Sequence, residues 1–315
     1  MLLKIIPSDT KIAFTKLRGA AFALSLVLLA LAVGAFVTRG LNFGIDFTGG
    51  TQIVVTTPGP ANLEEVRRVV GDLHQGTPVV QTFGAPNAVK IGVPLQPETD
   101  GEAGPDIAIA DQVMAALEAA MPGVQMESSG EISGVVSGEL VRAGAMAVGL
   151  ALLAMLAYVW FRFEWQFSIG AVAALAHDVL LTIGMFSVTQ IEFNLSIIAA
   201  ILTIVGYSMN DTVVVYDRIR ENMRKYKKIP VTELLDGAIN DTLSRTTMTS
   251  VTTLIALIAL YVLGGEVLRG FSFAMIWGVV IGTYSSIFIA APILILTGVR
   301  SENAPSETKA DPIVS

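Results

Sequence analysis

The chain has 315 residues, of which 53% are hydrophobic and only 15% are charged. Soluble domains carry about 25% charged residues, so this composition is typical of a membrane protein. The net charge of −7 argues against nucleic acid as a partner. Because the sequence has no cysteine and only two histidines, it excludes disulfides and thiolate metal sites and argues against zinc. We therefore expect no metal and no cofactor.

The apolar residues collect in six blocks, each near or above the roughly 18 residues that cross a bilayer as a helix. The blocks cover residues 20–37, 139–160, 167–188, 193–215, 247–264 and 271–298. We predict one membrane helix for each block and therefore an α-helical integral membrane protein. Five of the six helices fall in a continuous membrane domain, 138–300.

The first block could also be the apolar part of a signal peptide, because Lys11, Lys16 and Arg18 precede it. A signal peptide has about 7–15 apolar residues and ends in a small-x-small cleavage site. The block is longer than this and leads into Phe-Val-Thr-Arg at 36–39. We therefore interpret it as a retained membrane helix.

Lysine and arginine are unevenly distributed between the connecting segments. Segment 1–19 contains four of them and segment 217–245 contains seven, whereas the turn between the third and fourth blocks contains none. By the positive-inside rule, these two segments and the tail 301–315 face the cytoplasm. Residues 38–137 then lie outside the membrane on the opposite side.

The pattern of residues 38–137 predicts one extracytoplasmic domain. The expected elements are a β-branched strand at 51–56, an amphipathic helix capped by Asn62, two short strands at 79–83 and 88–93 around a turn at 84–87, a helix at 107–121 and a last strand at 124–127. This order suits an α+β ferredoxin-like domain. It would lie between the first and second membrane helices.

Segment 217–245 contains a second amphipathic element. Between Val231 and Leu243, apolar residues share one helical face and acidic residues lie elsewhere. We expect a helix that lies along the membrane surface or against a partner. Since its polar face has no basic residues, a protein partner fits better than anionic lipid.

The fourth block contains a carboxylate, Asp211, which follows Asn210 inside a long apolar run. A charge at the centre of a membrane helix costs about 2.5–3.5 kcal/mol on insertion scales. Such residues usually face the interior of a bundle and mark a substrate path or a proton relay. Burial disfavours the charged carboxylate and a nearby cation favours it, so Asp211 is a candidate for loading and releasing a proton.

Arg245 is the candidate cation, at the cytoplasmic entry of the fifth block. It shares a helical face with Thr249 and Thr252. Arg245 could instead reach toward lipid headgroups, and the threonines could bond only to the carbonyls of their own helix.

Asp178 lies near the middle of the third block, next to His177. It could carry part of the relay, or either aspartate could simply hydrogen-bond a neighbouring helix. His177 fits a packing or hydrogen-bonding residue better than a relay member. The sequence has no P-loop motif and nothing that resembles a hydrolytic triad, so we do not expect an enzyme.

Four stretches resemble the SecD/SecF family of protein-export membrane subunits. Residues 43–51, Phe-Gly-Ile-Asp-Phe-Thr-Gly-Gly-Thr, are similar to its signature beside the first helix. Residues 206–222 and 244–254 are similar to the fourth-helix and fifth-helix motifs of the SecF branch, and 176–179 to its third helix.

The resemblance implies the six-helix half of an RND-like 6+6 bundle in the bacterial cytoplasmic (inner) membrane. Its partners would be SecD as the other half, the SecY-SecE-SecG channel, YajC, preprotein substrates and the surrounding lipid. It would use the proton motive force to drive or complete export. Asp211 would be the proton-relay carboxylate and Arg245 its regulating cation, with Asn210, Asp178, Thr249 and Thr252 as supporting polar residues. Gly44, Asp46, Gly49 and Gly50 would shape the turn into the outer domain, where glycine permits positive φ.

Two other functions remain open from the sequence. One is an RND-type exporter of small molecules or lipids, although such a chain usually has two large outer domains. The other is a scaffold that stabilises the translocon without transporting anything. A carboxylate site could also couple to Na⁺ instead of H⁺.

Overall fold

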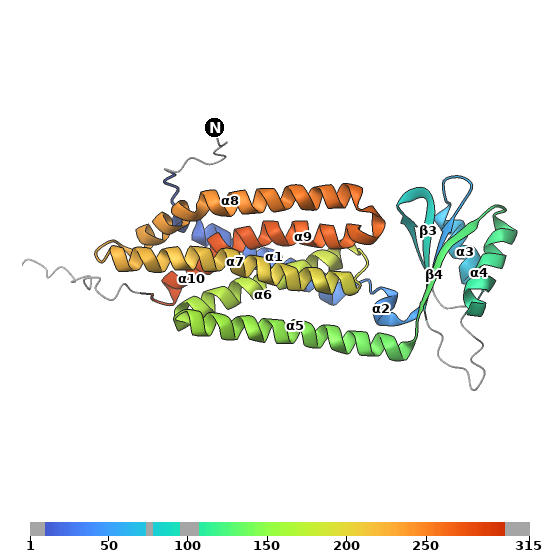
Figure 1. Cartoon of the computed structure of the whole chain (residues 1–315), viewed down its shortest axis with the longest axis horizontal. Helices are drawn as coiled ribbons and strands as arrows, with labels where there is room; N and C mark the ends of the chain where they lie inside the picture. The colour runs from blue at the N-terminus through green and yellow to red at the C-terminus, as the bar shows by residue number, and fades with distance from the viewer. Residues whose placement is uncertain (1–9, 74–77, 95–106, 300–315) are drawn as a thin grey trace, which may run out of the picture.

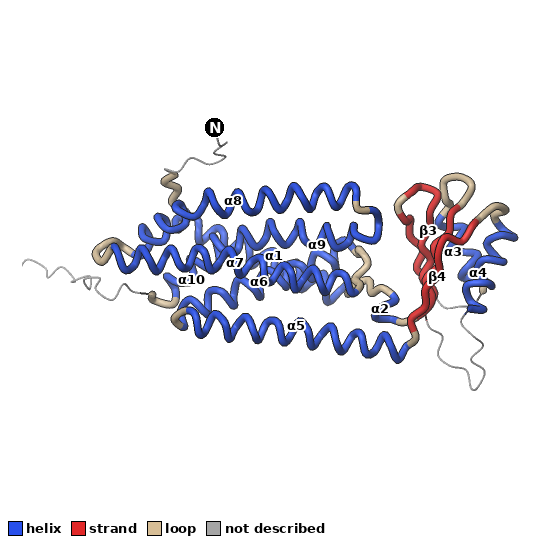
Figure 2. The backbone as a smooth tube through the Cα atoms, viewed as in Figure 1, coloured by secondary structure: helices blue, strands red, loops and turns tan. Residues whose placement is uncertain are grey.

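The computed structural model describes residues 10–73, 78–94 and 107–299 of the chain. It has two parts, a bundle of long helices and a small α+β domain at one end of the bundle (Figures 1 and 2). The predicted fold class is therefore confirmed. The expected tail 301–315 and the first nine residues of the N-terminal segment lie outside the described residues.

The bundle consists of long apolar helices. They are α1 (Arg18–Arg39), α5 (Gly134–Arg162), α6 (Trp165–Thr189), α7 (Leu195–Lys225), α8 (Val231–Leu263) and a last helix made of α9 (Gly265–Ser285), the π-helical turn η2 (Ser286–Ala290) and α10 (Ala291–Leu296). Six helical segments of the described chain are long and apolar enough to cross a membrane. The chain is thus a multi-pass membrane protein, as predicted.

The six spans are not equally buried. Those of α6, α7 and the last helix are largely buried and form the centre of the bundle, whereas those of α1, α5 and α8 are mostly exposed. The three central helices therefore offer most of the positions at which a polar side chain is removed from lipid.

The amphipathic stretch 231–243 does not form a separate surface helix, and our interpretation of it was wrong. It is the first part of α8, which continues without a break into the fifth span because no proline interrupts it. Its apolar face, with Leu235, Ala238 and Ile239, is fully buried within the chain itself. Its carboxylate Asp236 accepts two hydrogen bonds from Thr15, in the short 3-10 helix before α1.

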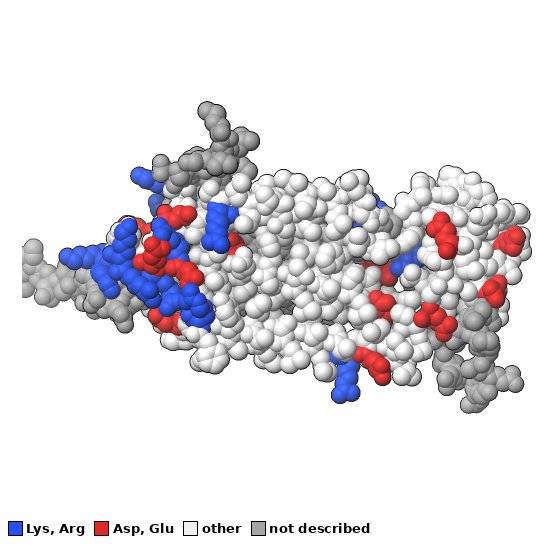
Figure 3. All heavy atoms as spheres, in the orientation of Figure 1, with Lys and Arg blue, Asp and Glu red and all other residues white. Residues whose placement is uncertain are grey.

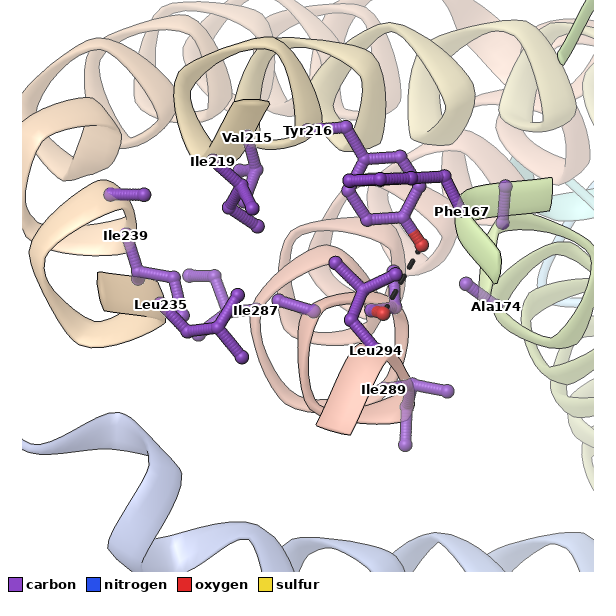
Figure 4. Close-up of a cluster of buried hydrophobic side chains, with 14 of the residues drawn as sticks. Phe167, Ala174, Val215, Tyr216, Ile219, Leu235, Ile239, Ile287, Ile289 and Leu294 are labelled. Atoms are coloured by element: carbon purple, nitrogen blue, oxygen red, sulfur yellow. Dashed lines mark hydrogen bonds between the residues drawn. The ribbon is translucent and has the colours of Figure 1, made fainter. Parts of the chain in front are cut away.

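The apolar face of early α8 joins the largest hydrophobic cluster of the bundle (Figure 4). The cluster collects side chains from α6, α7, α8, η2 and α10, including Phe167, Ala174, Val215, Tyr216, Ile219, Leu235, Ile239, Ile287, Ile289 and Leu294. The buried Tyr216 hydroxyl donates a hydrogen bond to the Ala290 carbonyl at 3.1 Å, which is the dashed line in Figure 4. This cluster fixes α7 against η2 on the side of the bundle remote from the α+β domain.

The α+β domain follows the predicted order. Its elements are β1 (Gly50–Thr56), α3 (Leu63–Gly71), β2 (Val79–Phe83), β3 (Ala85–Pro94), α4 (Ile107–Ala120) and β4 (Gln125–Ile132). The strands form one antiparallel sheet in the order β2-β3-β1-β4, as in a ferredoxin-like fold. Both helices lie on the side of the sheet that faces away from the bundle (Figure 1).

Two details of the predicted sheet were wrong. The four-residue turn at 84–87 is a tighter turn centred on Gly84 (φ 77°), and β3 already begins at Ala85. The last strand continues to Ile132 instead of ending at 127, because it pairs with β1 over the whole length of that strand. Its side chains are almost all exposed, so the alternation that identifies a half-buried strand was absent.

Charged residues gather at opposite ends of the molecule. In Figure 3, lysine and arginine crowd the end of the bundle that is remote from the α+β domain, while acidic residues are scattered over the domain. The surface between them is almost free of charge in this view. This separation agrees with a bundle that crosses a membrane.

Candidate functional site

Asp211 lies on α7 at the centre of the bundle and is 7% exposed. Its two carboxylate oxygens accept hydrogen bonds from two other helices. Thr246 Oγ1 of α8 donates to Oδ1 at 2.6 Å, and Ser286 Oγ of η2 donates to Oδ2 at 2.6 Å. The carboxylate is thus held by neutral hydroxyl groups, and it connects α7, α8 and the last helix.

Asp178 is a second buried carboxylate, near the middle of α6 and 1% exposed. Its Oδ2 accepts hydrogen bonds from Ser208 Oγ of α7 at 2.6 Å and from Ser285 Oγ of α9 at 2.7 Å. Its Oδ1 lies 2.9 Å from Nδ1 of His177, whose ring stacks on Tyr284. The sets of hydrogen bonds around Asp178 and Asp211 therefore share two helices, α7 and the last helix.

Four consecutive residues of the last helix, 283–286, connect the two buried carboxylates to the surrounding helices. Thr283 Oγ1 lies 2.8 Å from Ser250 Oγ on α8, and the Tyr284 hydroxyl lies 2.9 Å from Ser25 Oγ on α1. The next two, Ser285 and Ser286, donate to the carboxylates on α6 and α7. Since successive helical residues point about 100° apart, four polar residues in a row reach four different helices.

The helix changes its geometry where these residues lie. From Ser286 to Ala290 it is π-helical, and the amide of Ala291 donates to the carbonyl of Ser286, five residues earlier. Pro292 follows and has no amide hydrogen for a normal helical bond, which explains a widened turn just before it. Such π-turns frequently occur at functional sites. Ser286 is the first residue of this turn, so the donor to Asp211 sits where the helix is least regular.

Arg245, the candidate cation, is exposed on α8 and forms no ion pair with Asp211. Within 4.0 Å, no ion pair of Arg245 is present among the described residues. Its guanidinium is nevertheless near enough to act electrostatically on the Asp211 carboxylate. The direct donor from α8 is instead the next residue, Thr246.

The other predicted polar residues lie away from the carboxylate. Thr249 and Thr252 are exposed and donate to the carbonyls of their own helix, as one of our alternatives anticipated. Asn210 is exposed as well. We call these three exposed residues together with Arg245 the Arg245 face.

The sequence interpretation missed the donors Ser208, Thr246, Ser285 and Ser286. A signal for the last two was present, because Thr-Tyr-Ser-Ser at 283–286 is a polar run inside an otherwise apolar block. Nothing in the sequence indicated which hydroxyl would meet which carboxylate, since that depends on how the helices pack.

The predicted signature turn connects α1 to the α+β domain through the short helix α2 (Ile45–Thr48). Gly49 (φ 68°) and Gly50 (φ 126°) have positive φ, as expected, and a Cβ on Gly50 would overlap the Val93 carbonyl oxygen. Gly44 has a negative φ of −72°, so the explanation that glycine permits positive φ was wrong for this residue. A Cβ there would instead lie 2.7 Å from Oε1 of Glu192, so Gly44 is small because the bundle approaches closely.

Asp46 in this turn caps a membrane helix. Its Oδ2 accepts a hydrogen bond at 2.9 Å from the amide of Leu195, the first residue of α7. A carboxylate at a helix N-terminus satisfies a free amide and interacts favourably with the helix dipole. The turn before the α+β domain is therefore attached directly to the helix that carries Asp211.

Two further contacts hold the domain on the bundle. Phe43 and Phe193 form a parallel β-bridge, with the Gly44 amide donating to the Phe193 carbonyl at 2.9 Å. Lys90 of β3 forms a half-buried ion pair with Glu192, in the loop between α6 and α7, at 2.6 Å. We call these contacts and the Asp46 cap the junction.

Comparison with protein families identifies the chain. The profile described as protein export membrane protein SecD/SecF, C-terminal, matches residues 112–300, and that of the SecD/SecF GG motif matches residues 34–57. The chain belongs to the SecD/SecF family. The first match contains both buried carboxylates and their donors, and the second contains the signature turn with Asp46, Gly49 and Gly50.

Individual relatives place the chain in the SecF branch of this family. A protein translocase subunit SecF from Cereibacter sphaeroides is 43% identical over 314 residues, 98% of this chain and 96% of the relative. A SecF from Vibrio alginolyticus is 40% identical and covers 96% of this chain and 95% of the relative. These relatives are named as translocase subunits and not as enzymes, which agrees with our expectation that the chain is not an enzyme.

A third relative joins the SecF region to a longer chain. The protein translocase subunit SecDF of Brucella abortus is 40% identical over 309 residues, 98% of this chain but only 39% of the relative. The chain thus corresponds to about two fifths of this SecDF protein.

Two solved SecDF structures have the same fold as this SecD/SecF chain. The crystal structure of SecDF from Thermus thermophilus, described as a translocon-associated membrane protein, matches with a TM-score of 0.82 at 36% identity and covers 93% of this chain and 39% of that one. SecDF in a super-membrane-facing form matches with a TM-score of 0.66 at 37% identity, covering 92% and 39%. The two matches thus differ in TM-score at nearly equal identity and coverage.

Proposed function

We propose that the chain is a SecF-type subunit that uses the proton motive force, together with SecD, to drive or complete the export of preproteins through the SecY channel. The observation that carries this proposal is the Asp211 carboxylate, buried in the membrane and held by hydroxyl groups of α8 and η2. A carboxylate bonded only to neutral donors can gain or lose a proton without breaking a buried ion pair.

Protonation of Asp211 changes what the carboxyl group can do. As an anion it only accepts hydrogen bonds, whereas the protonated group also donates one. Ser286 Oγ has a second acceptor within reach, the Thr283 carbonyl at 3.1 Å. When Asp211 is protonated, the Ser286 hydroxyl turns to that carbonyl, and the link between α7 and η2 changes. The π-turn provides the local freedom for this rearrangement.

The junction supplies a route from this change to the α+β domain. Asp46 caps α7, and Lys90 is paired with Glu192 just before α7 begins. A shift of α7 therefore carries the domain with it, and the domain pulls the emerging polypeptide outward or prevents it from sliding back. The lower TM-score of the SecDF structure in a super-membrane-facing form, at nearly equal identity, supports a movement of this kind.

The energy available is sufficient for such a switch. One elementary charge that crosses a potential of 100 mV releases about 2.3 kcal/mol. At about 1.4 kcal/mol for each factor of ten, this changes the ratio of two conformations roughly fifty-fold.

The Arg245 face supports SecD as the partner within the membrane. Arg245, Asn210, Thr249 and Thr252 are exposed in the chain by itself, and a charged group facing lipid is costly. The match to this chain covers only 39% of the relatives named SecDF. We propose that SecD covers the Arg245 face and completes the site. The SecY-SecE-SecG channel, YajC and the preprotein would associate with this pair in the inner membrane, with both termini cytoplasmic and the α+β domain outside.

Export into inside-out vesicles tests the proposal. The Asp211→Asn variant takes the place of the wild-type chain in the assembled complex. Late-stage translocation is then measured with and without a proton gradient. Asp217→Asn is a matched control, because Asp217 lies on the same helix but pairs with Arg162 on the exposed surface. We expect Asp211→Asn to remove the dependence on the gradient and Asp217→Asn to preserve it.

The scaffold function predicts a different outcome. If the Asp211→Asn complex assembles and keeps its response to the gradient, Asp211 is a structural hydrogen-bonding residue and the coupling proposal is wrong. A parallel series with a sodium gradient identifies the coupling ion, since a response to sodium alone would exclude the proton.

A further inference from the structure

We propose that Nε2 of His177 binds a proton, so that His177 and Asp178 form a second protonation site, coupled to Asp211 through Ser285 and Ser286. The inference depends on the proposed function in one respect, that Asp211 carries a proton. It assigns a function to a pair that the export proposal leaves unused.

The hydrogen bonds of Asp178 determine the tautomer of His177. An ionised carboxylate only accepts, so Nδ1 of His177, 2.9 Å from Oδ1, must be the donor. The lone pair of the neutral imidazole then lies on Nε2. A proton that binds there converts the pair from a net charge of −1 to neutral, while Asp178 keeps its bonds from His177, Ser208 and Ser285.

Nε2 is buried and has no hydrogen-bond partner among the described residues. His177 is 4% exposed, so this atom is not simply turned to the surface. A buried polar atom without a partner costs about 1–3 kcal/mol. The unpaired Nε2, on a ring whose other nitrogen is bonded to a carboxylate, is the position of this pair at which a proton can bind.

The surroundings of the pair contain one other titratable contact. Tyr284 of α9 stacks on the imidazole, and its hydroxyl contacts Ser25 and the Ala21 carbonyl of α1. From α7 the contact is Ser208, a neutral donor, and Asp211 on the same helix is the acidic group in the adjacent set of hydrogen bonds. No cation other than the imidazole itself is paired with Asp178 in the described chain.

Ser285 and Ser286 connect the two carboxylates. Ser285 donates to Asp178, and its neighbour Ser286 donates to Asp211. Each hydroxyl also has a carbonyl of its own helix within reach, Gly282 for Ser285 at 3.2 Å and Thr283 for Ser286 at 3.1 Å. A hydroxyl has one hydrogen to donate, so each serine alternates between a carboxylate and its backbone acceptor. Because they are adjacent at the start of a π-turn, a rearrangement at one displaces the other.

The proton on Nε2 can be observed directly, because the sequence contains only two histidines, His74 and His177. The full-length His74→Gln chain is labelled with ¹⁵N-histidine and reconstituted in lipid with unlabelled SecD. Its nitrogen NMR spectrum then contains the signals of one imidazole, that of His177. We expect its Nε2 signal to change from the unprotonated to the protonated form as the pH falls. A signal that remains unprotonated over the whole pH range in which the protein stays folded overturns the proposal.

The coupling is tested by repeating this titration in a cycle of variants. With Asp211→Asn, the pH of the His177 transition should shift, as expected for two sites that interact. With Ser285→Ala in both backgrounds this shift should become smaller. Ser272→Ala is the control, because Ser272 is buried on the same helix and donates only to the carbonyl of Leu268. An identical transition with Asp and Asn at position 211, or a shift that Ser285→Ala leaves unchanged, contradicts the coupling.

The outcomes separate this inference from the proposed function. If export loses its gradient dependence in Asp211→Asn while Nε2 never binds a proton, the second site is wrong and the export proposal stands. If Nε2 titrates and responds to Asp211 while export keeps its gradient dependence, the second site stands and the export proposal fails.

Discussion

The polar centre of the bundle and the junction with the α+β domain are built from different interactions. In the centre, two carboxylates are bonded to hydroxyl groups that have alternative acceptors within reach. At the junction, an ion pair, a helix cap and a β-bridge each have one geometry. Hydroxyl groups with a second acceptor permit a rearrangement when a proton binds, whereas the junction contacts would have to break. On our proposal, movement arises in the membrane and is passed on to the outer domain through the junction.

The largest expected effect comes from the turn at the junction. Gly50→Ala places a Cβ against the Val93 carbonyl at a backbone with φ of 126°. Strain of this kind costs about 1–3 kcal/mol before the overlap is counted, so we expect a loss of about 3 kcal/mol or more in stability. Thermal unfolding of the purified chain measures it. Gly130→Ala is the control, because no atom lies within 4 Å of the added Cβ; equal stabilities of the two variants would show that the turn is not rigid.

The next effect concerns the polar centre. Ser286→Ala removes one of the two donors to Asp211, which costs about 1.5–3 kcal/mol for a bond to a charged group. Because the protonated carboxyl has less need of that donor, we expect the loss of stability to be larger at high pH than at low pH. Unfolding measured across pH tests this. A penalty that does not depend on pH would mean that Asp211 keeps one protonation state, and Ser187→Ala, whose hydroxyl bonds only to the Ile183 carbonyl, should show such a constant penalty.

A smaller effect is expected at the start of α7. Asp46→Ala removes the acceptor of the Leu195 amide and should cost about 1 kcal/mol, the usual value for a lost helix cap. Hydrogen exchange of the first turn of α7 measures the loss locally. Asp46→Asn keeps an acceptor and should exchange almost as slowly as the wild type; equally fast exchange in both variants would mean that the charge matters more than the cap.

The smallest expected effect is a difference in coupling energy between a half-buried ion pair and an exposed one. In a double-mutant cycle, Lys90→Ala and Glu192→Ala should show a coupling of about 1 kcal/mol, since both side chains are less than one fifth exposed. The exposed pair Arg162–Asp217, with exposures of 41% and 45%, should show a coupling near zero. If the two couplings are equal, Lys90 and Glu192 do not hold the domain on the bundle.

The sequence predicted the parts of this structure that depend on local patterns. Six long apolar blocks indicate six spans, and Asp211 stands out because a carboxylate in such a block is costly. The order of strands and helices in the α+β domain followed from β-branched runs and helical spacing. In each case the signal lies within a short stretch of chain.

The rest depends on contacts between distant segments. Thr246 and Ser286 reach Asp211 only because three helices pack with a particular rotation, and hydroxyls are too common in membrane helices to indicate this. Arg245 was the candidate cation for Asp211 from its charge and depth, and the structure leaves it exposed on α8 without an ion pair to that carboxylate. The start of α8 was read as a separate surface helix because its apolar face does not reveal what covers it.

The most direct test of the account measures movement in both regions at once. The chain has no cysteine, so pairs of spin labels can be attached at introduced cysteines without background. One pair spans the bundle, at the exposed Phe161 and Met248, and one spans the junction, at the exposed Val79 and Val188. In the reconstituted complex, the account predicts that lowering the pH changes the distance in the bundle but not across the junction, and that Asp211→Asn abolishes the change. A distance that changes across the junction, or a change in the bundle that persists in Asp211→Asn, would contradict it.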